Sequence, residues 1–597
     1  MRVCLAMRPP LFLTQIYTTM KRFLTLSLVL LMLVGIVEAQ SDMRKRFEER
    51  RAERRERYER MRSEQQKQFD EFRRRQNARY VGQLRQEWKQ YEVVDGVIEK
   101  TRKDSALLRA YQAEILSPEL DTKSYEEITM EVTNPLPTKN DTVLTIKLDT
   151  TIIIESVEDV ERLLEEIRAQ IPLHQLDSIK AVKDSIAAQP VLDTTALEIA
   201  VEEVVRIPEP EPQPEPIAPI EALEEEYDLV SVSLYGTLVS VAFPQDADLH
   251  LQSVNEDGIA TLWEQIADTV VPSRFDLTIT SCLDQRAELK LCDWAYLRLV
   301  QSIAKKRYGD TNEAVIFASY IMAQSGYKIR LGFKEDYVFM LFASHHEIYG
   351  MKKVMLEDDC YFIMDGRLSG SFYISNVGYD KEQRFSLLIA QEQKVDYEIS
   401  DTMVVTSAKG CSLSYQINLN MIHFYEDYPA GRLFFGDESS KWLLGVKTPL
   451  DSITKSTLYP QIQDSIQGLT PWKAVAKVLN WVQTGFKYAF DDDVWGTDRV
   501  FFPSETLYYP NSDCEDRAIL FSTLVRDILH MDVVLLYFEN PEHLATAVHI
   551  PVEEKPGEFV MYNDKKYMVC DPTLKNGPIG RNMTHYIGAT PKIIVID

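Results

Sequence analysis

The sequence predicts an α+β protein with several domains, and three observations lead to that fold class. The chain has 597 residues, of which 45% are hydrophobic and 10% aromatic, so it can bury at least one large core. From residue 227 onward, segments with helical spacing of apolar residues occur together with segments in which apolar and polar residues alternate. Helices packed on an antiparallel sheet give an α+β fold.

Residues 1–39 are expected to be a leader and a signal peptide. Met20 is followed by the basic pair Lys21 and Arg22, and the segment ends in small residues up to Ala39. The apolar run between them has about fifteen residues, which is shorter than the roughly 20 that a membrane anchor needs. We therefore expect cleavage after Ala39 and export to the periplasm or cell envelope, or secretion.

Composition excludes several classes of protein. Seven cysteines are too few for a disulfide-stapled scaffold, although one or two bonds with unassigned pairing stay open. No cysteine and histidine cluster has metal-ligand spacing, so we expect no structural zinc and no cofactor. The net charge is -26, and this acidic bulk argues against nucleic-acid binding.

Residues 40–90 are expected to form a long basic amphipathic helix of coiled-coil type. Residues 44–89 contain 17 Lys and Arg against 9 Asp and Glu, and Phe47, Tyr58, Phe69 and Tyr80 recur every 11 residues. Eleven residues make about three helical turns, so these aromatics share one face. One interpretation is that residues 43–90 dock on an envelope or protein partner; the other is a solvated helix that spaces the domains or packs back on the protein.

Residues 91–226 are expected to be an acidic, proline-rich linker. The run PEPEPQPEPIAP, from Pro208 to Pro219, predicts an extended polyproline segment. The run TVLTIKLDTTIII is compatible with paired strands and VEDVERLLEEIRAQI with a helix, but neither builds a core.

The remainder divides into three predicted parts. Residues 227–375 begin with a β-hairpin whose turn is Tyr235-Gly236, followed by helices at 291–307 and 312–325 and then by strands. Residues 376–455 are expected to be a β-rich connecting region. Residues 456–597 are expected to contain the helix TPWKAVAKVLNWVQTGF, a long loop through Trp495, a helix that begins near Cys514, and strands to the end.

The segment SDCEDRAILFSTLVRDIL carries the candidate nucleophile. Its apolar residues have helical spacing, so Cys514 is predicted to lie at a helix N-terminus, where backbone N–H groups favour a thiolate and an oxyanion. A strand opened by His543 and a strand ending in Asp571 supply a base and an orienting carboxylate. The alternative is that Cys514 is a small core residue and His543 an ordinary buried polar group.

These residues resemble the transglutaminase-like superfamily, of the exported bacterial type, which has a papain-like core. The resemblance covers about residues 469–573 and rests on Cys514-x-Asp516-x-Ala518, the His-led strand and the final Asp-Pro-Thr. It implies that Cys514 is the nucleophile, His543 the base and Asp571 the residue that orients the imidazole.

The sequence departs from the family pattern at several points. Ser512 stands where the family usually has glycine, and Leu544 follows the histidine where an aromatic is usual. His549 is a rival base, because six residues along a strand place both histidines on one face. Three carboxylates, those of Asp513, Glu515 and Asp516, are expected to raise the pKa of the thiol.

A second, degenerate copy of this unit is predicted within residues 285–375. The segment RYGDTNEAVIFASYIMAQSGYKIRLGF runs parallel to the cysteine helix, with Asp310 at the cysteine position, Tyr337 or Val338 at the histidine position and Asp365 matching Asp571. Such a unit is expected to fold without contributing chemistry. Convergent patterning without duplication is the alternative.

The sequence therefore predicts an exported cysteine peptidase or amidase that acts on a peptide or protein substrate through a Cys514, His543 and Asp571 triad. An amine in place of water as acyl acceptor would make it a cross-linking acyltransferase. A non-catalytic envelope scaffold is the alternative from another class.

Overall fold

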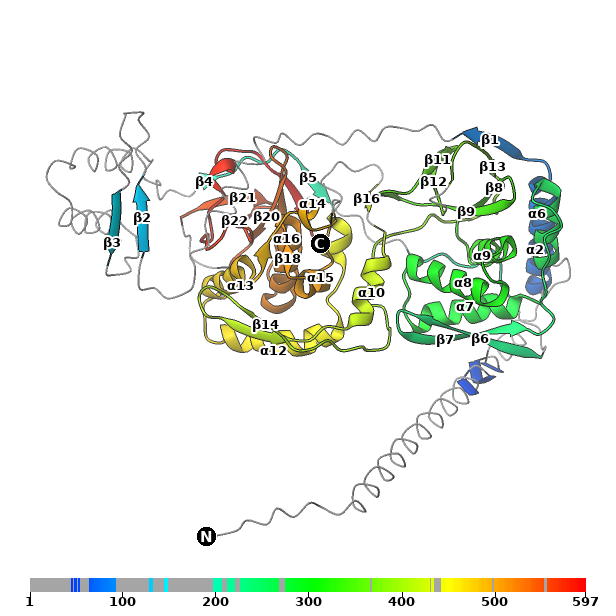
Figure 1. The fold of residues 1–597 in the computed structure, drawn as a ribbon, viewed down its shortest axis with the longest axis horizontal. Helices are drawn as coiled ribbons and strands as arrows, with labels where there is room; N and C mark the ends of the chain where they lie inside the picture. Colours follow the sequence, from blue (N-terminus) through cyan, green and yellow to red (C-terminus); the bar gives the residue numbers. More distant parts are fainter. Residues whose placement is uncertain are drawn as a thin grey trace, which may run out of the picture. The chain divides into compact units, whose positions relative to one another are not determined.

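The structure is a computed structural model in which antiparallel sheets pack against helices, so the α+β class is confirmed (Figure 1). It describes residues 45–46, 48–50, 52–53, 64–92, 128–132, 144–148, 197–206, 212–220, 226–267, 274–364, 368–429, 431–433, 442–495, 499–551 and 556–596. The predicted signal peptide and the residues Phe47, Tyr58 and Asp365 lie outside these ranges, as does the side chain of Phe69.

Chain contacts divide the protein into two compact units. Unit 1 comprises Met1–Val94, Gln213–Ala343 and Met351–Phe385, and unit 2 comprises Asp95–Pro212, Ser344–Gly350 and Ser386–Asp597.

Unit 1 has three layers: a sheet, a layer of helices and a hairpin (Figure 1). Its sheet has the order β1-β13-β8-β9-β12-β11, with antiparallel neighbours throughout. The elements are α2 (Glu64–Leu84), β1 (Trp88–Glu92), β6 (Tyr227–Leu234), β7 (Thr237–Pro244), α6 (Glu256–Ala267), α7 (Asp276–Glu288), α8 (Asp293–Tyr308), α9 (Asn312–Gln324), β8 (Ile329–Lys334), β9 (Tyr337–Ala343), β11 (Lys353–Leu356), β12 (Asp359–Ile363) and β13 (Ser371–Ser375).

The predicted hairpin is confirmed. Strands β6 and β7 pair from Tyr227 opposite Pro244 to Leu234 opposite Thr237. The two turn residues, Tyr235 and Gly236, both have positive φ, 45° and 77°. This is the conformation that matches the twist of the flanking strands, and Gly236 adopts it without steric cost.

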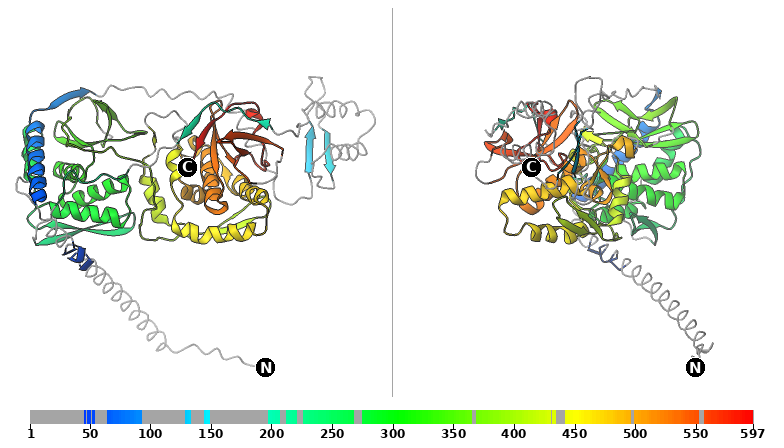
Figure 2. Two further views of the ribbon diagram at one scale, coloured as in Figure 1. Left: turned by 180° about the vertical axis from the view of Figure 1, so that it is seen from behind. Right: turned by 60° about the vertical axis from the view of Figure 1, so that its left-hand side comes forward.

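Helix α2 packs on other elements of unit 1, as in the second of the two interpretations of the basic helix (Figures 1 and 2). The prediction of a helix through residue 90 is wrong at its end, because α2 stops at Leu84 and the strand β1 begins at Trp88. The ring of Tyr80 is buried between Trp263 and Tyr379, with centroids 4.8 and 4.4 Å away. Arg73 donates two hydrogen bonds to Asp276, one of them 2.7 Å long, and both side chains are buried. Basic residues of α2 thus also serve as internal contacts.

Unit 2 is built around a sheet with the order β4-β21-β22-β20-β19-β23-β5. Helix α16 packs on β20 and β19, and α11, α13 and α15 pack on α16. The strands are β2 (Ile128–Val132), β3 (Leu144–Leu148), β4 (Leu197–Glu198), β5 (Val204–Arg206), β10 (His346–Ile348), β14 (Met403–Thr406), β15 (Ser412–Tyr415), β16 (Gly431–Leu433), β17 (Lys487–Tyr488), β18 (Asn511–Ser512), β19 (Val533–Phe538), β20 (His543–Val548), β21 (Glu558–Tyr562), β22 (Lys565–Cys570) and β23 (Lys592–Val595). The helices are α10 (Leu419–Asp427), α11 (Leu443–Lys447), α12 (Ser452–Ile466), α13 (Pro471–Gly485), α14 (Asp491–Val494), α15 (Pro503–Tyr508), α16 (Cys514–Leu524), the π-helix η3 (Val525–Leu529) and the 3₁₀-helix η4 (Thr584–Tyr586).

Part of the predicted linker belongs to the sheet of unit 2. Strand β4 pairs parallel with β21 at one edge, and β5 pairs parallel with β23 at the other. Between them, Ile199 and Val201 pack on the buried cluster of one sheet face. Residues 197–206 therefore complete a folded unit, which local composition does not reveal.

The region 376–455 differs from its β-rich prediction, because it contains the helices α10 and α11 beside short strands. The side chain of Asn418 caps α10 by accepting from the backbone N–H of Asn420. An Asn cap before an apolar run is a helix-start signal, and the sequence interpretation missed it.

The two sheets have the same strand order. After α9, five strands of unit 1 lie in the order β11-β12-β9-β8-β13; after α16, five strands of unit 2 lie in the order β21-β22-β20-β19-β23. When the five strands of each sheet are numbered by their order in the chain, without β10, which belongs to another sheet, both sheets have the order 3-4-2-1-5. Helix α9 begins at Asn312, whereas Asp310 precedes the Thr311 cap and pairs with Lys305 at 2.7 Å, so Asn312 is the residue that corresponds to Cys514 by position.

Among the described helices, none is both long enough and apolar enough to cross a bilayer.

We predict that Arg73→Ala lowers the free energy of unfolding by about 3–5 kcal/mol, because it leaves the buried Asp276 carboxylate without its partner. Arg79→Ala is the matched control on the same helix: its pair with Asp380 is 2.9 Å long, but the side chains are 44% and 51% exposed, so a loss of at most about 1 kcal/mol is expected. Urea denaturation measures both. Equal losses would contradict the buried ion pair.

Candidate functional site

Helix α16 begins inside unit 2, and its first turn is satisfied by its own carboxylates. Asp513 is the N-cap and accepts from the backbone N–H of Asp516, while Asp516 accepts in return from the N–H of Asp513 at 3.2 Å. Asp516 also accepts from the backbone N–H of Phe501 at 2.9 Å. This capping box fixes the helix start and places Cys514 at the first helical position, as predicted.

His543 and Asp571 meet at the ends of neighbouring strands. His543 is the first residue of β20, and Asp571 directly follows β22, which pairs with β20. Nε2 of His543 lies 3.0 Å from Oδ2 of Asp571, and both side chains are fully buried. The strand register thus brings together a base and a carboxylate that are 28 residues apart.

The carboxylate of Asp571 is held by the chain that follows it. Its Oδ1 accepts from the backbone N–H of Thr573 at 2.8 Å and of Leu574 at 3.3 Å. Gln483 of α13 donates to the backbone oxygens of Asp571 at 2.9 Å and Gly577 at 3.1 Å. With one oxygen held by the loop, the other is directed at the imidazole.

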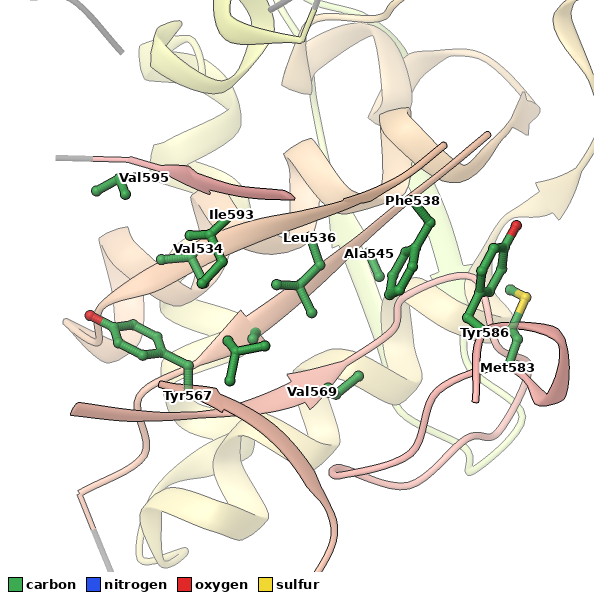
Figure 3. Close-up of a cluster of buried hydrophobic side chains, with 12 residues drawn as sticks. Val534, Leu536, Phe538, Ala545, Tyr567, Val569, Met583, Tyr586, Ile593 and Val595 are labelled. Atoms are coloured by element: carbon green, nitrogen blue, oxygen red, sulfur yellow. The ribbon is translucent and has the colours of Figure 1, made fainter. Parts of the chain in front are cut away.

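Aromatic rings fix the plane of the imidazole. The ring of Tyr586 stacks on His543 with centroids 5.0 Å apart and planes inclined by 13°. The ring of Phe538 lies 4.6 Å from that of Tyr586 and is tilted by 35° to it, and both belong to the buried cluster of one sheet face (Figure 3). The hydroxyl of Tyr586 donates to the backbone oxygen of Pro541 at 3.1 Å, just before the histidine.

The sulfur of Cys514 has a close partner in the next residue. The thiol donates a hydrogen bond to Oε2 of Glu515, 2.8 Å away. The backbone N–H of Leu544, the residue after His543, favours the thiolate and so lowers the pKa of Cys514. Cys514 is only 7% exposed, so a substrate must displace neighbouring atoms to reach it.

This environment stabilises the thiol form. Burial raises the pKa of Cys514 well above its usual value, the charges of Glu515 and Asp513 raise it further, and the Leu544 N–H lowers it. The raised pKa was predicted from the carboxylates. Burial, the largest cause, was not part of that prediction.

Asp513, Cys514 and Glu515 are the only group of possible metal ligands found in the described residues, with ligand atoms within 4.8 Å of one another. All three are consecutive residues at one helix start, and a soft thiol beside two carboxylates without a histidine fits no common metal preference. Burial and neighbouring carboxylates raise the pKa of Asp513 and Asp516, so shared protons can relieve the repulsion. We assign no metal here.

Arg517 connects the cysteine helix to its surroundings without forming an ion pair with the helix start. Its guanidinium donates to Ser512 Oγ at 3.1 Å and to the backbone oxygens of Gln483 and Phe486 at 3.2 and 2.7 Å. It also lies over the ring of Tyr488, 5.2 Å from the centroid. Gln483 and Arg517 thus link α16 to the loop that carries Asp571.

The rival base His549 has a different environment. Its Nδ1 lies 2.9 Å from the backbone oxygen of Lys566, and it follows β20, whereas His543 opens that strand. The structure therefore brings Asp571 together with His543.

Sequence reasoning missed Glu515 as the acceptor of the thiol, and also Gln483, Arg517 and Tyr586. Arg517 had one usable signal: an arginine directly before the apolar run AILF requires internal acceptors when that run is buried. The contacts of Gln483 and Tyr586 depend on tertiary structure.

Comparison with protein-family models gives no match, and comparison with curated proteins gives none either.

We predict that iodoacetamide labels Cys514 of the native protein slowly at pH 7, with a midpoint above the value of an ordinary free cysteine, because an acid with a raised pKa keeps its proton to higher pH. A raised pKa in the folded state also links stability to pH. The contribution of the protonated thiol to the free energy of unfolding is complete below the ordinary pKa of cysteine and is lost as the pH rises through the pKa in the folded state. Peptide mapping by mass spectrometry measures each cysteine separately. A midpoint at or below about 8.5, the ordinary value of a free cysteine, would contradict this prediction.

Proposed function

We propose that the protein is an exported cysteine hydrolase of peptide or isopeptide bonds, with a transglutaminase-like catalytic unit at residues 456–597. The observation that carries this proposal is the buried His543–Asp571 pair, 3.0 Å long, at the start of the strand β20 on which the cysteine helix α16 packs. The proposed base and orienting carboxylate are thus in contact, and the proposed nucleophile begins the helix that packs on the same strand.

The proposed reaction assigns one role to each residue. With Nε2 of His543 bound to Asp571, Nδ1 accepts the proton of the Cys514 thiol, and the sulfur attacks the carbonyl carbon. The backbone N–H of Cys514, which the capping box of Asp513 and Asp516 does not use, stabilises the oxyanion. The imidazolium then protonates the departing amine, leaving a thioester. Water converts the thioester into an acid; an amine would convert it into a new amide, which is the acyltransferase alternative.

Unit 1 is proposed to be the degenerate copy. Its sheet has the strand order of unit 2, but Asn312 begins α9 and Tyr337 begins β9. The side chain of Asn312 accepts from the N–H of Val338 at 2.8 Å and donates to the oxygen of Asp336 at 2.9 Å. An amide at the start of α9 therefore holds the beginning of β9, and it supplies no nucleophile.

One observation favours a second candidate function, that of a non-catalytic envelope scaffold. Cys514 is buried and hydrogen-bonded to a carboxylate, and these are the surroundings of an inert thiol. In that case both units bind partners, and neither reacts.

We predict that Cys514→Ala abolishes cleavage of envelope-derived peptides and isopeptides, and that His543→Ala or Asp571→Ala lowers turnover at least about a hundredfold. His549→Ala is the matched control, since it removes the other histidine near β20 without touching Asp571; most turnover should remain. Turnover is measured by liquid chromatography and mass spectrometry of the products.

Full activity of folded Cys514→Ala would refute the hydrolase proposal. Loss of turnover in His549→Ala together with full turnover in His543→Ala would show that His549 is the base. The proposed mechanism would otherwise stay the same.

A further inference from the structure

The contact between Cys514 and Glu515 is not explained by the proposed reaction. Nucleophilic catalysis needs the proton to leave the sulfur for an imidazole, yet the thiol donates at 2.8 Å to Oε2 of Glu515. Glu515 is itself buried, and it is not one of the two capping-box residues, although its side chain also interacts with that of Asp513. Its contact with the sulfur therefore has no role in starting the helix.

The other groups around the sulfur act in different directions. Asp513, at the cap of α16, repels a thiolate, and the Leu544 N–H from β20 stabilises one. Tyr488 of β17 and Arg517 of α16 interact with Cys514 through charge–charge interactions. His543 of β20 is bound to Asp571. Glu515 combines a negative charge with a direct hydrogen bond from the thiol.

We propose that Glu515 is a brake on the nucleophile: its carboxylate accepts the thiol hydrogen bond and keeps Cys514 protonated in the resting protein. The inference deepens the proposed hydrolase function and rests on it for its biological meaning. A carboxylate within hydrogen-bond distance favours S–H over S⁻, because separating the proton would leave two adjacent negative charges. Substrate binding must move or neutralise Glu515 before His543 can take the proton.

If Glu515 acts as this brake, its substitution should increase the reactivity of Cys514, whereas most substitutions at a reactive centre decrease it. Glu515→Gln keeps the size and the accepting oxygen of the side chain but removes the charge, so the thiolate fraction should increase. We expect the iodoacetamide labelling rate of Cys514 at pH 7 to rise at least about tenfold, as one pKa unit corresponds to a tenfold change in thiolate. The pH midpoint of labelling should decrease.

Asp516→Asn is the matched control. It removes a carboxylate from the same helical turn, but the contacts of Asp516 are to the backbone N–H groups of Phe501 and Asp513. Labelling of Cys514 in this variant should stay within about threefold of the wild type, well under the tenfold of one pKa unit. An equal acceleration in both variants would show that general charge, and not Glu515, holds the thiol.

Other cysteines of the chain report on folding in the same experiment. Cys570 lies fully buried in β22 and is labelled only after unfolding, whereas Cys411 is half-buried and serves as the reference thiol. If iodoacetamide labels Cys570 in Glu515→Gln, that variant is unfolded, and Glu515→Ala is then used for the same comparison.

Labelling requires no turnover, so the brake and the hydrolase can fail separately. Fast labelling of Cys514 in Glu515→Gln without any Cys514-dependent hydrolysis would support the proposed role of Glu515 and contradict the proposed hydrolase function. Unchanged or slower labelling in a folded Glu515 variant would overturn the brake, even if Cys514→Ala abolishes turnover.

Discussion

Helix α16 begins inside unit 2, and the need to satisfy its first turn determines much of the site around it. Buried N–H groups at a helix start require acceptors, and here Asp513 and Asp516 supply them. The same carboxylates bring negative charge beside Cys514, which opposes the effect of the helix dipole on a thiolate. The cap therefore adds to the negative charge beside the thiol, whose own hydrogen bond goes to Glu515.

A rigid frame surrounds this helix start. The register of β20 and β22 sets His543 against Asp571, Tyr586 stacks on the imidazole, and Gln483 and Arg517 connect the acid loop to α16. Such contacts hold the imidazole of His543 and the carboxylate of Asp571 in place. The frame is therefore compatible with a reaction in which activation depends on a change at Glu515.

Much of the fold of residues 456–597 was predictable from local patterns. The apolar spacing after Cys514, the strand opened by His543 and the helix α13 before the loop all follow from periodicity and caps. The strands β4 and β5 of the sheet lie in residues that were predicted to be linker. Strands of two or three residues are too short to show an alternating pattern in the sequence.

The role of Glu515 was only partly predictable. The sequence shows a carboxylate next to Cys514, but the side-chain direction that brings its Oε2 to the sulfur appears only in the fold. Likewise, the packing of Tyr80 between Trp263 and Tyr379 could not be separated from a solvated or docking helix by an aromatic repeat alone.

The most direct test of the account is whether Cys514 is acylated with the help of His543. Wild-type protein and His543→Ala would be mixed with p-nitrophenyl acetate, quenched in acid at successive times and mapped by mass spectrometry. We expect an acetyl group on Cys514 in the wild type, formed at least about a hundredfold more slowly in the variant, because general base catalysis contributes that much or more. Equal acetylation rates at Cys514 in the two folded proteins would contradict the proposed nucleophile and base.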